Sequence, residues 1–117
     1  KYAVDKAKEV ADKHIVSFNL AMEHKVNIAM GTDAGTPFNM HGNSAHELLL
    51  MTKAGMSPME AIVTSTKNSS ELIGIDQQYG TLEVGKFANL IVLDENPLEN
   101  IETVEKPRAV YKKGTLV

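Results

Sequence analysis

The sequence contains no cysteine, no long apolar run and no concentration of basic charge. Without cysteine the chain forms no disulfide bond and offers no thiolate to a metal, which fits a reducing compartment. No apolar run approaches the roughly 20 residues that a membrane-spanning helix needs. The 12 basic residues are scattered along the sequence and are outnumbered by 15 acidic residues, so no nucleic-acid patch is expected. We therefore expect a cytoplasmic protein with neither a membrane nor a nucleic-acid partner.

The 117 residues allow one domain with a hydrophobic core. The opening segment carries apolar residues at spacings of three and four, which predict a helix of about six turns with one apolar stripe. The members of this stripe are Val4, Ala7, Ala11, Ile15, Phe18 and Met22. The chain begins at Lys1 within this helix and without an initiating methionine. We interpret it as a piece of a longer protein, and a signal peptide ahead of Lys1 is an open alternative.

A short strand, "VNIAMG", is predicted over residues 26–31. Ile28, Ala29 and Met30 are apolar in succession, as in parallel strands that are covered on both faces. Such a strand needs a neighbour on each side, and no other segment of the same character lies near it in the sequence. We therefore expect the neighbouring strands to lie outside these residues. The isolated chain would then expose apolar surface and unpaired strand edges and would self-associate.

Further helices are predicted between the strand and Tyr79. One has an explicit start, with Ser57 as the cap, Pro58 in the first turn and Glu60 in position to close a capping box. A later short helix is expected to pack Leu72 and Ile73 inward. The helix that starts at Ser57 is also expected to have a buried face, which consists of Met59, Ile62, Val63 and Thr66.

Composition changes near Tyr79, where β-rich runs punctuated by glycine begin. A hairpin is predicted around Lys113–Gly114. The order of helix, strand, helices and short strands predicts an α/β protein with two parts, residues 1–78 and residues 79–117.

One carboxylate, Asp33, stands where the predicted strand ends and a glycine-rich loop begins. In open α/β sheets and α/β barrels, ligands bind at the carboxyl ends of the strands. A carboxylate at the edge of an apolar core needs a cation, hydrogen-bond donors or a shifted pKa. The alternative is that Asp33 caps the following turn. Gly31 and Gly35 allow the backbone to approach a ligand, and His41 and His46 follow.

Three segments in order extend this observation: "VNIAMGTDAG", "HGNSAHELLLMTKAGMSPMEAI" and "GTLEVGKFANLIVLDENPLENI". Together they resemble the C-terminal third of the metal-dependent amidohydrolase superfamily, in the imidazolonepropionase-related branch that includes Xaa-Pro dipeptidases. The resemblance implies the C-terminal fragment of a distorted (β/α)8 TIM barrel. Residues 26–33 would be the eighth barrel strand. Residues 1–78 would hold the last helix-strand-helix units, and residues 79–117 the C-terminal strands of a composite β-sandwich.

The resemblance also implies a reaction, the hydrolysis of C–N bonds in amides or peptides of small substrates. Asp33 would be a ligand of one or two divalent metals, with zinc expected. It would also be the catalytic residue that takes a proton from the attacking water and passes it to the leaving nitrogen. His41 and Asn43 would bind substrate, Thr32 would orient the loop by hydrogen bonding, and the weaker candidates His46 and Glu47 would line the pocket.

The sequence departs from the superfamily pattern in one respect, and three alternative functions stay open. The superfamily's other metal ligands have no counterpart here, and one carboxylate does not hold a catalytic zinc, so the 117 residues alone are expected to be inactive. The full-length protein would pair this chain with its missing N-terminal part, act on a small-molecule or dipeptide substrate and form a homo-oligomer. The alternatives are a cyclic amidase, a deaminase of the same superfamily, or a relative that serves as a non-catalytic scaffold.

Overall fold

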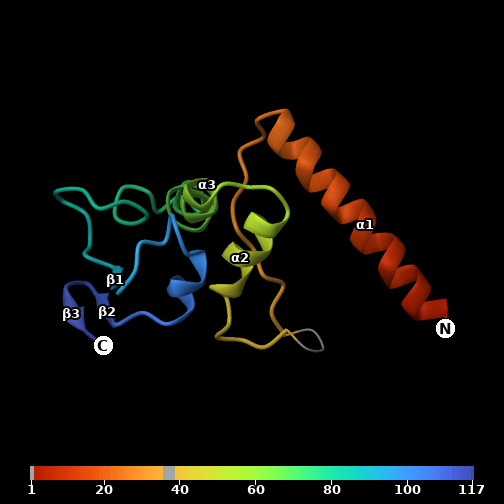
Figure 1. Ribbon diagram of the computed structural model, residues 1–117. Helices are drawn as coiled ribbons and strands as arrows, with labels where there is room; N and C mark the ends of the chain where they lie inside the picture. Colours follow the sequence, from red (N-terminus) through yellow and green to blue (C-terminus); the bar gives the residue numbers. More distant parts are fainter. Residues whose placement is uncertain (1, 36–38) are drawn as a thin grey trace.

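The computed structural model describes residues 2–35 and 39–117, apart from the side chains of residues 2–5 and 7–9. The chain combines helices with one small sheet (Figure 1), which confirms the predicted α/β class. In chain order the elements are α1 (Tyr2–Glu23), α2 (His46–Lys53), α3 (Pro58–Val63), the π-helical segment η1 (Thr64–Asn68), α4 (Ser69–Leu72), β1 (Leu90–Val92), the 3-10 segment η2 (Ile101–Glu105), β2 (Ala109–Lys112) and β3 (Thr115–Leu116).

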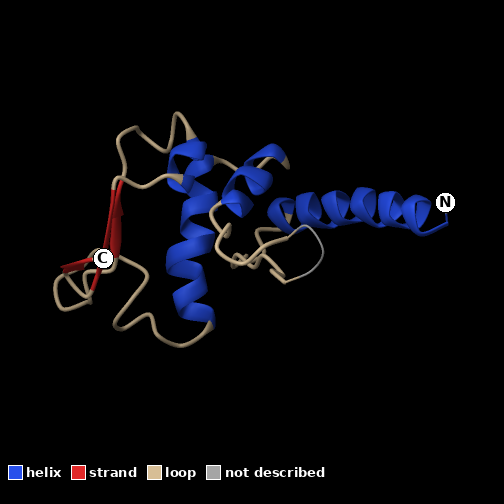
Figure 2. Cartoon of the chain, turned by 90° about the horizontal axis from the view of Figure 1, so that it is seen from below, coloured by secondary structure: helices blue, strands red, loops and turns tan. Residues whose placement is uncertain are grey.

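Three consecutive elements form the middle of the molecule. α3, η1 and α4 continue from one another as a single rod, residues 58–72, which we call the central rod. Figure 2 shows the central rod between α1 on one side and the sheet on the other. α2 packs against α3 and also contacts η2, so it connects the central rod to the C-terminal part.

The core is small and lies where α2, the central rod and η2 meet. Among the described residues five hydrophobic side chains are buried: Leu48, Met51, Met56, Ala61 and Ile101. Partly buried side chains surround them, including Ile28 and Met30 from the segment after α1. The core therefore joins residues as far apart in the sequence as Ile28 and Ile101, which are 73 positions apart.

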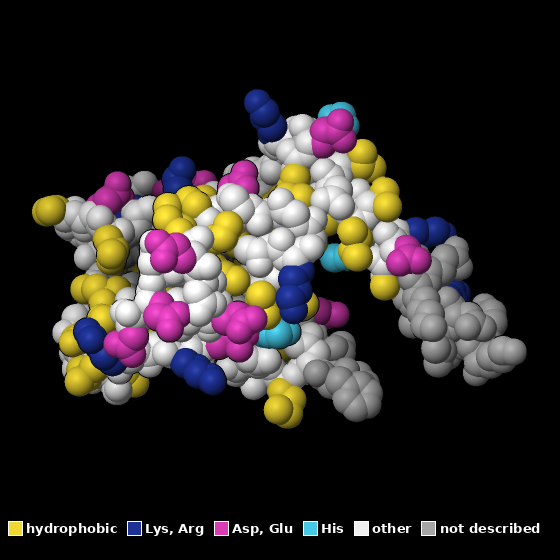
Figure 3. Space-filling model, viewed as in Figure 1, with side chains coloured by type: hydrophobic (Ala, Val, Ile, Leu, Met, Phe, Trp, Pro, Cys, Tyr) yellow, Lys and Arg dark blue, Asp and Glu magenta, His cyan; other side chains and the backbone are white. Residues whose placement is uncertain are grey.

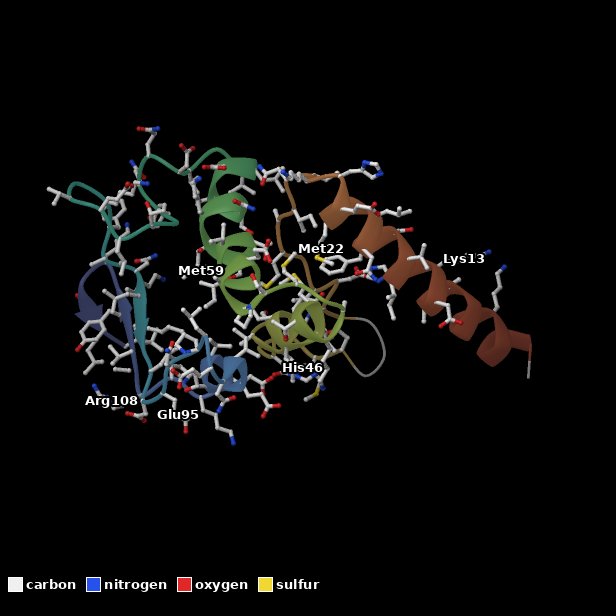
Figure 4. All side chains as sticks on the ribbon, turned by 45° about the horizontal axis from the view of Figure 1, so that its top comes forward. Lys13, Met22, His46, Met59, Glu95 and Arg108 are labelled. Atoms are coloured by element: carbon white, nitrogen blue, oxygen red, sulfur yellow. The ribbon has the colours of Figure 1, made fainter. Side chains whose placement is uncertain are left out.

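α1 touches this core through its last turns. Phe18 and Met22 pack against it, and Figure 4 shows Met22 pointing from α1 toward the central rod. Earlier in the helix Ile15 is 48% exposed, and the predicted stripe members Val4 and Ala7 lie outside the described side chains. Within the part of the chain that the structure describes, no helix has the length and apolarity needed to cross a membrane.

The strand predicted over residues 26–31 does not form within this chain. The segment is extended but belongs to no sheet among the described residues. A strand exists through hydrogen bonds to a neighbouring strand, and here the neighbour is the central rod instead. The Met30 amide donates to the Thr64 carbonyl at 3.1 Å, and the Asn68 side chain donates to the Ile28 carbonyl at 2.8 Å.

The capping box at the start of α3 is confirmed. The Glu60 amide donates to the Ser57 hydroxyl at 3.3 Å, and the Ser57 amide donates to the Glu60 carboxylate at 3.0 Å. The Ser57 hydroxyl also donates to this carboxylate. Hydrogen bonding from the Ser57 side chain, and then from its backbone, holds the pKa of Glu60 below its ordinary value. This cap sets where the central rod begins.

Of the two predictions of buried side chains along and just after the central rod, one is wrong and the other is only half right. Leu72 and Ile73 were expected to pack inward but are 76% and 66% exposed, because no described element covers the end of α4. Of the face predicted for the helix that starts at Ser57, Ile62 packs against the core and Val63 is half-buried. Met59 and Thr66 of the same predicted face are exposed. The most buried positions of the rod have small side chains: Ala61, Thr64 and Ser70.

The sheet is antiparallel with the order β1-β2-β3. The predicted hairpin is confirmed, since β2 and β3 are joined at Lys113 and Gly114, whose φ angles are 50° and 80°. Two positive φ angles are the signature of a type I′ turn, which matches the twist of antiparallel strands. Asn89 supports the turn by accepting a hydrogen bond from the Lys113 amide at 2.8 Å.

The molecule exposes more surface than a compact protein of its mass. Its accessible area is 8731 Å², whereas a compact monomer of 12.8 kDa exposes about 6,300 Å². Its radius of gyration is 15.9 Å, against about 13 Å for a compact chain of 100 residues. Figure 3 shows α1 standing apart from the body across a hollow, with apolar side chains open on this face.

We predict that the 117-residue chain, produced alone, self-associates through its open apolar faces. Sedimentation velocity over a wide concentration range is expected to show larger species at higher concentration. Ile15→Lys is expected to weaken the association because it places a charge on the open face of α1. Val84→Lys is the control, since it changes a fully exposed valine outside any helix or strand. A monodisperse wild-type monomer at all concentrations would contradict this prediction.

Candidate functional site

Asp33 lies at the end of the extended segment that follows α1. In extended backbone alternate side chains point to opposite sides, and Ile28 and Met30 pack against the core. Ala29 and Gly31 therefore belong to the side that faces away from it. At Asp33 the extended conformation ends, because its φ angle is 49°, in the left-handed region that Asp and Asn tolerate better than most residues. The Asp33 side chain is exposed.

One backbone and one side-chain hydrogen bond close the loop that follows Asp33. The Gly35 amide donates to the Asn39 carbonyl at 2.9 Å, and the Asn39 side-chain amide donates to the Thr32 carbonyl. Thr32 thus contributes its main-chain oxygen to the loop. Residues 36–38 lie outside the described part. The two ends of the loop are therefore tied together directly beside Asp33.

The structure brings His41 to this loop. A Cβ atom placed on Gly35 would lie 3.0 Å from His41 Nε2, so the imidazole rests directly against the Gly35 backbone. Gly35 also has a φ angle of 104°, which favours glycine for a second reason. Asn43 is exposed, and its carbonyl accepts a hydrogen bond from the His46 amide at 3.1 Å, just before α2. Asp33 and His41 thus share one loop, whereas Asn43 stands at the next helix start.

His46 does not face this loop but binds the C-terminal part of the chain. Its Nδ1 lies 2.7 Å from Glu105 Oε1, and the two side chains are 40% and 26% exposed. Figure 4 shows His46 beside η2. The pair spans 59 positions in the sequence, which is why no local pattern pointed to Glu105. It fixes the start of α2 relative to η2.

A groove of about 770 Å³ opens between α1, residues 28–31 and α2. Its walls are mostly apolar, with Phe18 and Met51 among them, and Glu47 and His14 add polar groups. Glu47 was a candidate for lining a pocket, whereas His14 was not among the predicted site residues. The spacing of four between His14 and Phe18, which puts both on one helix face, is the signal that could have placed it here.

A metal site needs more ligands than the described residues bring together. Structural and catalytic zinc sites use at least three protein ligands. Among the side chains that the structure describes, no three from His, Asp or Glu are grouped closely enough to hold an ion. Asp33 offers one carboxylate at the loop. The described residues therefore do not make a metal site by themselves, and any site built on Asp33 requires ligands from elsewhere.

Comparison with known proteins gives consistent results. The model of the amidohydrolase family matches residues 2–117. The chain is 36% identical over 116 residues to an ochratoxinase of Aspergillus niger, covering 95% of this chain and 23% of that protein. It is 34% identical over 89 residues to an imidazolonepropionase of Thermoplasma volcanium, covering 70% of this chain and 21% of that protein. The chain spans about a quarter of the length of these curated relatives.

A solved structure agrees with the sequence matches. The crystal structure of a Xaa-Pro dipeptidase with bound methionine in the active site is similar to this chain with a TM-score of 0.88 and 37% identity. The similarity covers 97% of this chain and 27% of that one. The backbone path of the present chain is therefore similar to that of about a quarter of this larger chain.

We predict that the His46–Glu105 pair stabilises the contact between α2 and η2. A double-mutant cycle with His46→Ala and Glu105→Ala, measured by denaturant unfolding of the full-length protein, is expected to give a coupling of about 0.5–1 kcal/mol. The matched control is the more exposed pair Arg108–Asp94, with atoms 3.3 Å apart, for which a coupling near zero is expected. Equal coupling energies for the two pairs would contradict the prediction.

Proposed function

Because the chain belongs to the amidohydrolase family, we propose that it is the Asp33-bearing portion of a metal-dependent hydrolase that cleaves C–N bonds. Members of this family are generally metal-dependent. The relatives that match over nearly the whole chain are an ochratoxinase and a Xaa-Pro dipeptidase, the second named for cleaving a peptide bond. We therefore favour amide or peptide bonds of small or dipeptide substrates.

One observation carries the proposal within this chain. Asp33 ends an extended segment whose other face packs on the core, and a closed loop holds it at the surface. A carboxylate that must meet a ligand needs both exposure and a fixed backbone.

Asp33 has two roles in the proposal, as a metal ligand and as a proton carrier. The remaining ligands come from outside these 117 residues, and zinc is the expected metal. When bound, such a metal lowers the pKa of water toward about 7 and polarises a carbonyl. The Asp33 carboxylate accepts the proton of the attacking water and delivers it to the leaving nitrogen. The chain alone is inactive on this proposal.

His41 and Asn43 are proposed to bind substrate. His41 lies against Gly35 in the same loop as Asp33, and both His41 and Asn43 are exposed. An imidazole and an amide side chain both offer hydrogen bonds to the polar groups of an amide or a carboxylate. We place them at the rim of the site and assign them no proton transfer.

The proposed place of the chain in the larger protein follows the same lines. Residues 26–33 would be the eighth strand of a (β/α)8 barrel, with the flanking strands supplied by the rest of the protein. Residues 1–78 would close the barrel, and residues 79–117 would add strands to a composite β-sandwich. The excess exposed surface and the quarter-length match to the curated relatives support this assignment.

The two enzymatic alternatives differ from the proposed function in substrate rather than in fold. A cyclic amidase is favoured by the imidazolonepropionase match, and a deaminase by a 5-methylthioadenosine/S-adenosylhomocysteine deaminase of Teredinibacter turnerae that is 32% identical over 90 residues. Both matches cover 70% of the chain, less than the 95% covered by the ochratoxinase. A non-catalytic scaffold is distinguished by metal content, since it would carry no catalytic metal.

We predict that Asp33→Asn in the full-length protein lowers kcat for hydrolysis of an amide or dipeptide substrate by about 10²–10⁴-fold, because an amide does not accept the proton. Asp12→Asn, an exposed position on α1, is the control and is expected to retain wild-type rates. Removal of metal by a chelator is expected to abolish activity, and zinc to restore it. Full activity of Asp33→Asn, or of the chelated protein, would overturn the proposed function.

A further inference from the structure

The backbone that leads to Asp33 is held by two groups from one turn of the central rod. The Thr64 carbonyl accepts the Met30 amide at 3.1 Å, and the Asn68 side chain donates to the Ile28 carbonyl at 2.8 Å. Because a carbonyl only accepts, the group that Asn68 presents there is its NH2. The two anchors act on alternate residues, on an amide and on a carbonyl. They therefore fix both the position and the rotation of the segment.

Both anchors lie in η1, the π-helical turn. A π turn carries i→i+5 hydrogen bonds and is found mostly as a single turn within an α-helix, frequently at functional sites. The Thr64 carbonyl, at the start of this turn, accepts from Met30 outside the helix and also from the Ser69 hydroxyl at 2.6 Å. Asn68, at the end of the turn, reaches the extended segment across 40 positions of sequence. The turn thus presents one acceptor and one donor to the segment.

The turn and the residue Ser70 that follows it are also packed and hydrogen-bonded on the side away from the extended segment. Thr64 is 3% exposed, and its hydroxyl donates to the Ala61 carbonyl at 2.7 Å. Ser70, two residues after the turn, is 5% exposed and lies so close to Gly80 that any side chain at Gly80 would collide with its hydroxyl. Thr64, which supplies one of the two anchors, is therefore buried and hydrogen-bonded within the central rod.

We propose that Asn68 is a positioning residue for Asp33, acting through the main chain of residues 28–33; this inference rests on the proposed function of Asp33. Asn68 does not touch the reacting atoms. It holds the Ile28 carbonyl so that the segment reaches the loop at one depth and one rotation. Five residues of extended chain cover about 16 Å, so a small rotation at Ile28 is carried to the carboxylate as a larger displacement.

The test compares three variants of the full-length protein. Asn68→Asp keeps the size of the side chain but removes the donor, and Asn68→Leu removes polarity without adding charge. Both are expected to lower kcat by about 10 to 100-fold, the cost of misplacing a catalytic group by about 1 Å. KM is expected to change by less than about threefold, which corresponds to about 0.65 kcal/mol of binding free energy at 25 °C. The matched control is Thr66→Ala, an exposed residue of the same turn that hydrogen-bonds within its own helix, to the Ile62 carbonyl, and it is expected to leave kcat unchanged.

A purely structural role gives a different result. The two Asn68 substitutions would then lower the melting temperature and the yield of folded protein, but kcat per folded molecule would equal that of the wild type. Equal kcat per folded molecule in both Asn68 variants overturns the proposal. A drop of the same size in Thr66→Ala also overturns it, because the effect would then belong to the turn as a whole.

Amide hydrogen exchange separates this inference from the proposed function. The Met30 amide is expected to exchange about tenfold faster in Asn68→Asp than in the wild type, because the segment opens more often, and Thr66→Ala is expected to match the wild type. If the wild-type protein hydrolyses no C–N bond but the Met30 effect appears, the proposed function fails and the anchoring role of Asn68 stands. If Met30 exchange is unchanged, the positioning role fails whatever the activity.

Discussion

The structure depends on how the backbone of residues 26–33 satisfies its polar groups without a neighbouring strand. Unpaired amides and carbonyls near a core are unfavourable, and here the central rod supplies the partners that a sheet would otherwise provide. Thr64 and Asn68 hold the segment, and the apolar side chains of Ile28 and Met30 then reach the core. The place of Asp33 follows from these contacts, because the segment ends at that residue.

The small core explains the shape of the molecule. Hydrophobic burial is concentrated between α2, the central rod and η2, while α1 is anchored only near its C-terminal end by Phe18 and Met22. The remainder of α1 extends over a groove whose walls are largely apolar. The chain spans about a quarter of the length of its curated relatives. Such open apolar surfaces are the places where the rest of a larger protein would pack.

Family membership and site chemistry carry different parts of the functional conclusion. A shared fold admits several reactions, and the relatives named here include an ochratoxinase, an imidazolonepropionase and a Xaa-Pro dipeptidase. What this chain contributes is one exposed carboxylate on a supported backbone, with His41 in the same loop. The His46–Glu105 pair and the core contacts of η2 join that region to the C-terminal strands.

The sequence by itself determined the features whose hydrogen bonds close within a few residues. These include the capping box of Ser57 and Glu60, the hairpin at Lys113 and Gly114, and the position of Asp33 after an apolar run. Only the tertiary structure decided that residues 26–31 form no strand within this chain, that Leu72 is exposed, and which distant residues contact the segment before Asp33 and the start of α2. The Asn68–Ile28 and His46–Glu105 contacts cross 40 and 59 positions. Local propensity carries no information about such pairs, because they form only when packing brings separate elements together.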